Sequence, residues 1–331
     1  MRFAPITAAL FACALAGCES KGVATPAAPT PETPVPALCV SSDCGEKVVL
    51  LDFPSAENLT FSPDGRLFVS GGLGVFEVRR DAAGAFQATD IAPGCGSGLG
   101  LAAHRGQLYA ICSGQRLFAG ALGTTPQLRE VFQLSGMCIS NGMAVGADGN
   151  LYVVDEPLNF CVPDPKVVRL KLDSADPLRV LSQETWVQGS PLGQLHLGLD
   201  NVLRFPNGLQ ARGSRFFGTD GGSLYSVDLL PDGRAGPVTP IHFEVAIRDD
   251  LGIAGEDLLV TDFATGRIQL ISQAGVALQA TERGLFSSPS SIRLGQPPMF
   301  APGDILVTET GVLTDNNLPL DRLSLFRRKA R

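Results

Sequence analysis

Carboxylate and amide side chains recur at one kind of position in this chain, directly before short apolar segments. The stretch "SAENLTF" carries Glu57 and Asn58, "FPNGLQ" carries Asn207, and "RDDLGI" carries Asp249 and Asp250. Oxygen donors of this kind bind hard cations such as Ca²⁺, and a carboxylate with a free oxygen can also take a proton from water. These residues can act together only if the fold brings their segments to one place.

The segments that carry these residues belong to a repeat. Short runs of Val, Leu, Ile, Phe and Tyr are separated by Gly, Pro and Asp-Gly turns, which is typical of an all-β protein. Six segments share a polar or small residue, an apolar strand, a tight turn and a second strand. Aligned at Leu59, Leu99, Gly142, Gly208, Leu251 and Ser291, they lie 40, 43, 66, 43 and 40 residues apart. This spacing predicts a six-bladed β-propeller with four-stranded blades.

Two further features bear on the predicted ring. Residues 47–53 form a strand with no turn partner and "DRLSLFRRK" is a last strand with no follower. We therefore expect the N-terminal strand to close the last blade. The long interval contains an insertion at about 156–201, which we expect to form a lid or substrate wall. Its Trp186 serves either packing or recognition.

The innermost strands of a propeller line its central channel, so six starting positions converge at one mouth. They are Glu57-Asn58, Ser97-Gly98, Ser140-Asn141, Pro206-Asn207, Asp249-Asp250 and Ser290-Ser291. Carboxylates that meet in a partly dry channel repel each other, and no Lys or Arg occupies an equivalent position. A divalent cation, most simply Ca²⁺, is the expected counter-charge. Asn58 is expected to turn the chain.

The blades resemble those of the regucalcin (senescence marker protein), gluconolactonase and LRE-like family of calcium-dependent propellers, and more distantly the paraoxonases. That family binds a catalytic ion through a Glu, the Asn of an Asn-Gly pair and an Asp. The resemblance implies Glu57, Asn207 and Asp250 as metal ligands, although "ENLTF" lacks the Pro and Trp of the family's Glu-x-Pro-x-Trp motif. The fourth ligand falls on Ser140 or, after a one-residue shift, on Asn141.

The resemblance also implies an activity, the hydrolysis of a small lactone or ester. The ion would polarise the carbonyl group, and Asp250 or Asp249 would act as general base for the attacking water. Other interpretations remain open. Many propellers only bind proteins or glycans, so a non-catalytic binding or scaffold protein is the alternative.

Several residues have simpler explanations. Asn-Gly and Asp-Gly pairs are also turn signals. The strand-ending residues Asp155, Asp220, Asp262 and Glu309 are most simply turn caps. The three histidines at 104, 196 and 242 are scattered and are expected to be loop or surface residues.

The N-terminus is expected to direct export. Arg2, a short apolar run and Leu15-Ala16-Gly17-Cys18 resemble a bacterial lipoprotein signal, in which residues 1–17 are removed and Cys18 is lipid-modified. The alternative is ordinary secretion with Cys18 inside a longer signal. Residues 18–38 are rich in Pro, Ala and Thr and are expected to tether a domain of residues 39–331. The expected location is the bacterial cell envelope, in the outer membrane facing the periplasm or the surface.

Six cysteines lie in the predicted domain, an even number that predicts three disulfides in an exported protein. They are Cys39, Cys44, Cys95, Cys112, Cys138 and Cys161. Sequential pairing is favoured because each pair brackets a turn or hairpin, and a metal cluster is the alternative. A net charge of −7 without a basic stripe gives no support to nucleic-acid binding. A monomer is expected.

Overall fold

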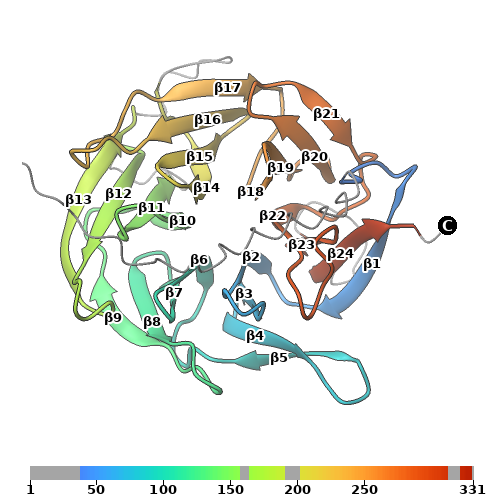
Figure 1. The fold of residues 1–331 in the computed structure, drawn as a ribbon, viewed down its shortest axis with the longest axis horizontal. Helices are drawn as coiled ribbons and strands as arrows, with labels where there is room; N and C mark the ends of the chain where they lie inside the picture. The colour runs from blue at the N-terminus through green and yellow to red at the C-terminus, as the bar shows by residue number, and fades with distance from the viewer. Residues whose placement is uncertain (1–37, 157–163, 191–201, 312–320, 330–331) are drawn as a thin grey trace, which may run out of the picture. The chain divides into compact units, whose positions relative to one another are not determined.

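Six four-stranded antiparallel sheets surround a central axis in the computed structural model of the chain (Figure 1). The structure describes residues 38–156, 164–190, 202–311 and 321–329. In five of the sheets the strand order follows the sequence, and in the sixth the first strand pairs beside the last one. The predicted all-β, six-bladed propeller is therefore confirmed.

The blades are numbered from the first complete sheet. Blade 1 contains β2 (Ala56–Phe61), β3 (Leu67–Gly71), β4 (Gly74–Arg80) and β5 (Phe86–Asp90). Blade 2 contains β6 (Gly98–His104), β7 (Gln107–Cys112), β8 (Arg116–Ala121) and β9 (Arg129–Gln133). Blade 3 contains β10 (Ile139–Val145), β11 (Leu151–Glu156), β12 (Lys166–Leu172) and β13 (Val180–Gln188).

The second half of the ring repeats this plan. Blade 4 contains β14 (Pro206–Arg212), β15 (Arg215–Asp220), β16 (Ser223–Asp228) and β17 (Thr239–Phe243). Blade 5 contains β18 (Leu251–Ala254), β19 (Asp257–Asp262), β20 (Arg267–Ser272) and β21 (Ala277–Ala280). Blade 6 contains β22 (Pro289–Leu294), β23 (Ile305–Glu309), β24 (Arg322–Arg328) and β1 (Gly45–Asp52).

Apolar packing joins each blade to the next. The buried side chains of the described residues form six clusters, and each cluster lies between two neighbouring blades. Between blades 3 and 4, Trp186 lies 4.7 Å from the ring of Tyr152 and 4.9 Å from that of Phe216. Trp186 therefore has a packing role. Burial of both faces of each inner strand explains the continuous apolar runs of the sequence.

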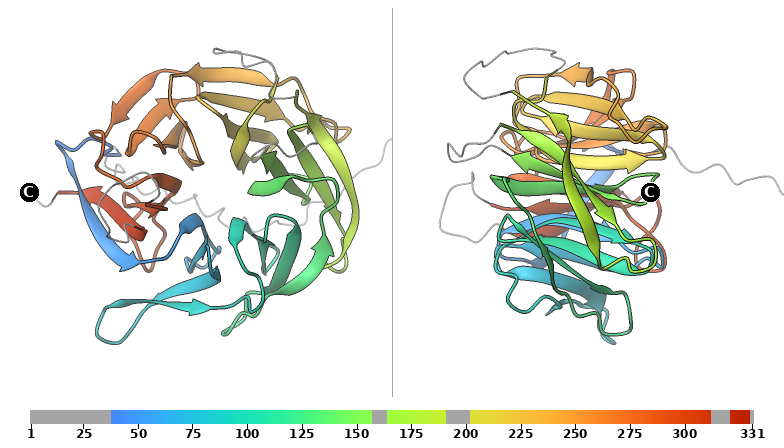
Figure 2. Two further views of the ribbon diagram at one scale, coloured as in Figure 1. Left: turned by 180° about the vertical axis from the view of Figure 1, so that it is seen from behind. Right: turned by 90° about the vertical axis from the view of Figure 1, so that its left-hand side faces the viewer.

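Blade 6 joins the two ends of the described domain. β1 pairs antiparallel with β24 from Gly45↔Arg328 to Asp52↔Arg322, and both views of Figure 2 are consistent with this closure. The Lys47 Nζ atom reaches across the blade to the Glu309 Oε2 atom, 2.7 Å away, and Glu309 is fully buried. The predicted closure of the ring by the N-terminal strand is confirmed.

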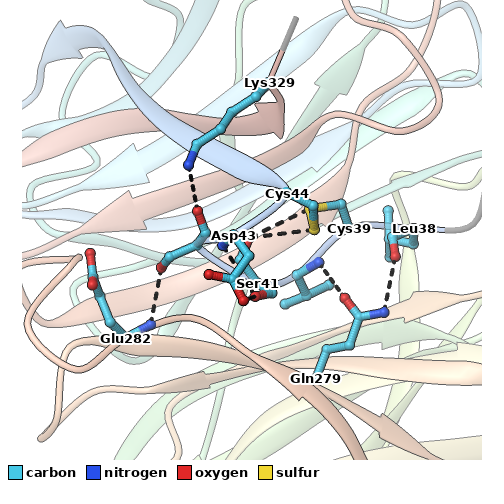
Figure 3. Close-up of a disulfide and its surroundings, with 10 residues drawn as sticks. Leu38, Cys39, Ser41, Asp43, Cys44, Gln279, Glu282 and Lys329 are labelled. Atoms are coloured by element: carbon cyan, nitrogen blue, oxygen red, sulfur yellow. Dashed lines mark hydrogen bonds between the residues drawn. A yellow bond between two sulfur atoms is a disulfide. The ribbon is translucent and has the colours of Figure 1, made fainter. Parts of the chain in front are cut away.

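A disulfide loop secures this closure (Figure 3). Cys39 and Cys44 are bonded, and the loop between them contacts two blades. Val40 N–H donates to the Gln279 side chain at 2.8 Å, and the Lys329 ammonium donates to the Ser42 carbonyl at 2.7 Å. The N-terminal segment is thereby attached to blade 5 as well as to blade 6.

The expected disulfides are confirmed where they can be observed. Cys95 bonds to Cys112, which ties the segment before β6 to the end of β7. Cys138 is disulfide-bonded, whereas Cys161 lies outside the described residues. Closing the loop between Cys95 and Cys112, which are 17 residues apart, stabilises the fold by about 3 kcal/mol in the chain-entropy model. The signal, Cys18 and the tether up to residue 37 also lie outside the described residues.

Part of the range in which we expected an insertion, about 156–201, belongs to blade 3 itself. Residues 166–172 and 180–188 of that range are β12 and β13, the ordinary outer strands of blade 3. They are therefore no lid, and the parts at 157–163 and 191–201 lie outside the described residues. Within the described part of the chain, no helix is long and apolar enough to cross a membrane.

The buried ion pair of blade 6 gives a prediction about stability. Lys47→Met would leave the Glu309 carboxylate buried without its cation, and we expect the free energy of unfolding to fall by about 3 kcal/mol. Chemical denaturation would measure this change. The double variant Lys47→Met/Glu309→Gln should recover most of the loss. The exposed Lys171→Met is the control, and an equal effect of the two single variants would contradict the prediction.

Candidate functional site

The innermost strands carry an irregularity at their first residues. In five blades the pairing register shifts at this point, for example between Ala56 and Leu59 in blade 1 and between Pro206 and Leu209 in blade 4. Such a β-bulge places two residues opposite one and re-aims a side chain. Here the re-aimed residues include Glu57 and Asn207, whose side chains line an axial cavity.

Hydroxyl groups hold these bulges and join neighbouring blades. In blade 4, Gly208 N–H donates to the Thr219 hydroxyl at 2.7 Å, and this hydroxyl donates to the Asp249 carbonyl of blade 5 at 2.7 Å. The same relay links blade 6 to blade 1, from Ser291 N–H through Thr308 to the Glu57 carbonyl. Two further relays use Ser70 and Thr261.

These relays define which residues are equivalent in space. The residue whose carbonyl accepts from the preceding blade is Glu57 in blade 1, Asp249 in blade 5 and Ser290 in blade 6. The bulge register places Asn141 of blade 3 and Asn207 of blade 4 at the same level. We call these five residues, together with Leu99 of blade 2, the axial ring.

The Asn-Gly pairs lie inside strands rather than in turns. A Cβ atom on Gly208 would lie 2.5 Å from the Asp250 Oδ1 atom, and one on Gly142 would lie 2.3 Å from the Asn207 carbonyl oxygen. Glycine is therefore needed where a bulge approaches the next blade. The interpretation of these pairs as turn signals is wrong for positions 141–142 and 207–208.

Four polar residues of the axial ring form the floor of a cavity of about 920 Å³. Glu57, Asn141, Asn207 and Asp249 line it, and Glu156, from the end of β11, joins them. The walls are more apolar and include Leu99, Ile139, Phe205, Ile247 and Phe263. A cavity of this size is typical of a small-molecule site.

Hydrogen bonds link the polar floor into a chain. The Asn141 amide donates to Glu156 Oε2 at 3.2 Å and approaches Glu57 Oε1 at 3.5 Å. The Asn207 amide donates to Glu156 Oε1 at 3.3 Å. Asn58 lies in β2 and donates to the Asn141 Oδ1 atom at 3.2 Å, so the expectation that Asn58 turns the chain is wrong. The structure also selects Asn141 over Ser140 as the third-blade residue at the cavity.

Burial and mutual repulsion raise the pKa values of the floor carboxyls. Burial is the main cause that raises the pKa of Glu57 from 4.5 to about 7, with hydrogen bonds from Ser290 and Asn141 opposing it. Burial, with repulsion from Glu57, also raises the pKa of Glu156 to about 7. The pKa of Asp249 rises well above its usual range for the same two reasons. No Lys or Arg of the described residues forms an ion pair with these three carboxyls.

Asp250 occupies a different position from the one expected. Its Oδ2 atom accepts from the Ser291 hydroxyl at 2.6 Å and from the Arg293 guanidinium at 2.8 Å. Its Oδ1 atom is buried without a hydrogen-bond partner in the described structure and lies against Gly208. Asp250 is not among the residues that line the cavity, whereas Asp249 is. Arg293, two residues after the aligned Ser291, supplies the charge partner that the sequence analysis did not foresee.

Glu156 is the functional candidate that sequence reasoning missed. It directly follows the strand-ending Asp155, and the residues at the same place in four other blades also line the cavity. These are Ser113, Gly221, Phe263 and Thr310. The signal was therefore present in the repeat, one position after each expected turn cap.

The four strand-ending acids accept backbone N–H groups, but only Asp262 does so within the turn that follows its own strand, as expected of a turn cap. Asp155 accepts Cys138 N–H at 2.5 Å, Asp220 accepts Phe205 N–H, and Glu309 accepts Ser287 N–H at 2.5 Å. Each bond fixes the segment that leads into the innermost strand of the same blade. Asp262 accepts Thr265 N–H at 3.2 Å. His242 lies on the outer strand β17 and contacts the Gly275 carbonyl. Neither His242 nor His104 lines the axial cavity.

The donor set fits a hard divalent cation. Among the described residues no group of three His, Cys, Asp or Glu side chains has the arrangement of a formed metal site. Nevertheless, three uncompensated carboxyls share the floor with two amide groups, and oxygen donors of these kinds suit Ca²⁺. A cation would remove the repulsion that raises their pKa values.

The fold and this floor define a six-bladed propeller with an acidic axial cavity. The sequence matches no protein-family model, and curated proteins give no significant match. Among solved structures, the calcium-binding protein regucalcin from Agrobacterium tumefaciens is similar, with a TM-score of 0.63 and 16% identity over 88% of this chain and 96% of that chain. These two chains therefore share the propeller architecture.

Two further solved structures have the same fold. A gluconolactonase from Xanthomonas campestris has a TM-score of 0.59 and 14% identity over 86% of this chain and 90% of that one. A PQQ-bound aldose sugar dehydrogenase from Streptomyces coelicolor has a TM-score of 0.56 and 16% identity over 86% and 98%. The resemblance to the regucalcin and gluconolactonase propellers is confirmed in fold. At identities this low, a shared fold does not show that this chain has the activity of these proteins.

The raised pKa values give a prediction about stability and pH. A carboxyl whose pKa is higher in the folded state stabilises the fold below its ordinary pKa and loses this contribution as the pH rises through the folded value. For Glu57 and Glu156 this window extends from about 4.5 to about 7. In a chelating buffer, we expect the melting temperature of the wild type, relative to Glu57→Gln, to fall by several degrees across this window.

Thermal melts at constant ionic strength would measure the difference. Glu156→Gln should flatten the profile in the same way as Glu57→Gln. Glu282→Gln, on an exposed turn, should retain the wild-type profile. Identical pH profiles for the wild type and Glu57→Gln would contradict this account of the cavity floor.

Proposed function

We propose that this chain is a divalent-cation-dependent hydrolase that acts on a small lactone or ester. The observation that carries the proposal is the convergence of Glu57, Asn141, Asn207 and Asp249 from four blades on one cavity floor. These four residues are the metal ligands we propose, so Asp249 replaces Asp250 in the set implied by the resemblance. Ca²⁺ is the ion that the oxygen donors suit best.

The remaining floor residues would orient the ligands. The Ser290 hydroxyl donates to the Asp249 Oδ2 atom at 2.7 Å and fixes that carboxylate. Glu156 accepts from both Asn141 and Asn207 and fixes their amide groups. Arg293 neutralises Asp250, so the carboxylates that face the cavity are the ones left to hold the ion.

The reaction needs a polarised carbonyl group, a water molecule and a base. A bound divalent cation would supply the polarisation and lower the pKa of water. Glu156 lines the cavity beside the proposed ligands and is the carboxylate we propose to take the proton from the attacking water. Asp250 is less suited to this task because it does not line the cavity and its carboxylate is paired with Arg293.

Metal content and hydrolysis of the purified full chain test this proposal. We expect about one Ca²⁺ per wild-type chain and calcium-dependent opening of a lactone. Glu57→Gln should lose both the ion and the activity, and Glu282→Gln should keep both. A folded wild type that binds no ion in excess calcium would overturn the hydrolase and leave a binding or scaffold propeller.

We further propose that the mature protein is anchored to a bacterial membrane through a lipid on Cys18. The residues Leu15-Ala16-Gly17-Cys18 and the Pro-rich segment that follows support this proposal. The proposed location is the cell envelope, with Glu19 favouring the outer membrane.

The intact mass of the protein from a bacterial membrane fraction would test the anchor. We expect a chain that begins at Cys18 and carries acyl groups. Cys18→Ser should appear without lipid and in the soluble fraction, whereas Cys13→Ser should remain in the membrane fraction. An unmodified mature chain that begins at another residue would contradict the anchor and leave ordinary secretion.

A further inference from the structure

The walls of the axial cavity differ in chemistry from its floor. The wall residues Leu99, Ile139, Phe205, Ile247 and Phe263 present apolar side chains beside the polar floor. They come from blades 2 to 5 or from the segments that lead into them, so the apolar wall spans several blades. Ile247 is 51% exposed, a large value for an isoleucine beside a cavity. An exposed apolar side chain at this place is available to contact a ligand.

Most polar side chains of the wall already have partners. Ser113, Gln115 and Thr310 donate to the backbone carbonyls of Cys95, Met137 and Ser288 at 2.9, 2.8 and 3.2 Å. The fully buried guanidinium of Arg248 bonds to Gly222, Gln269 and Glu244. These groups hold the loops in place. Ser97 is exposed at the rim, and the cavity-facing surface of the wall is thus largely apolar.

This division of the cavity sets the kind of substrate that fits. A polyhydroxylated lactone would place several hydroxyl groups against the wall without hydrogen-bond partners, which is unfavourable. An alkyl or aryl substituent would gain from burial against the same side chains. The reactive carbonyl would remain at the polar floor in both cases.

We propose that the substrate is a lactone or ester whose non-reacting part is apolar, rather than a sugar lactone. The proposal rests on the proposed hydrolase function for the carbonyl group and on the cavity wall for the rest of the molecule. Phe263 and Ile247 are the specificity-determining residues, because they line the cavity and Phe263 N–H binds the Ile247 carbonyl at 2.8 Å, which fixes the two side by side.

Binding of two lactams that are not hydrolysed tests the substrate class separately from catalysis. One is a six-membered lactam with a heptyl substituent, and the other is the lactam of gluconic acid. Titration calorimetry on the full chain with calcium should show at least about tenfold tighter binding of the heptyl lactam. Phe263→Ser should weaken that binding about tenfold without changing calcium binding. The exposed Val276→Ser, outside the cavity, is the matched control.

The outcomes separate this proposal from the hydrolase itself. Equal binding of the two lactams, or tighter binding of the gluconic lactam, would overturn the apolar substrate class even if calcium binding and hydrolysis are found. An unchanged affinity of Phe263→Ser for the heptyl lactam would overturn the role of the wall. A preference for the heptyl lactam without calcium binding or hydrolysis would uphold the apolar cavity and overturn only the proposed reaction.

Discussion

The hydroxyl relay at the start of the innermost strands is the interaction on which the site depends. A Ser or Thr of the second strand accepts the N–H group of a bulge and donates to a carbonyl of the next blade, as Thr308 does between Ser291 and Glu57. The bulge therefore has a fixed shape and a fixed position relative to the neighbouring blade. Because the carbonyl that accepts belongs to an axial residue, the bond that joins two blades also orients a side chain of the cavity floor.

The acidic residues near the axis differ in whether they have a charged partner. Two adjacent acids precede β18 in blade 5: Asp250 meets Arg293 and is neutralised, whereas Asp249 lines the cavity with Glu57 and Glu156. These three carboxyls, which form no ion pair with the described residues, thus share the cavity floor. The apolar wall above them lowers the local polarity and strengthens their repulsion. A site of this kind favours a cation at its floor and an apolar group above it.

The repeat spacing predicted the blades and the closing strand because each blade is a local unit with its own apolar pattern. The axial residues were predicted less well, because a one-residue slip in a strand exchanges the residues that face a given side. The alignment at Leu59 and Leu251 places Asp249 level with Glu57, as the structure does, and Asp250 entered the predicted ligand set only through the family resemblance. Glu156 was missed because its equivalents in other blades share a position and not a residue type. Arg293 comes from a neighbouring blade, so its contact with Asp250 depends on the assembled ring.

The disulfide loop of blade 6 also determines how the domain responds to mechanical force. A pull on the chain at Leu38 first reaches Cys39, and the bond to Cys44 carries the load past the intervening loop. Gln279 of blade 5 also holds the Leu38 carbonyl oxygen through its Nε2 atom at 3.3 Å, so blade 5 takes part of the load ahead of the disulfide, and blade 6 takes the rest through β1. Tension is therefore divided between two blades before it can peel β1 from β24, and the ring resists opening from the end at which it was closed.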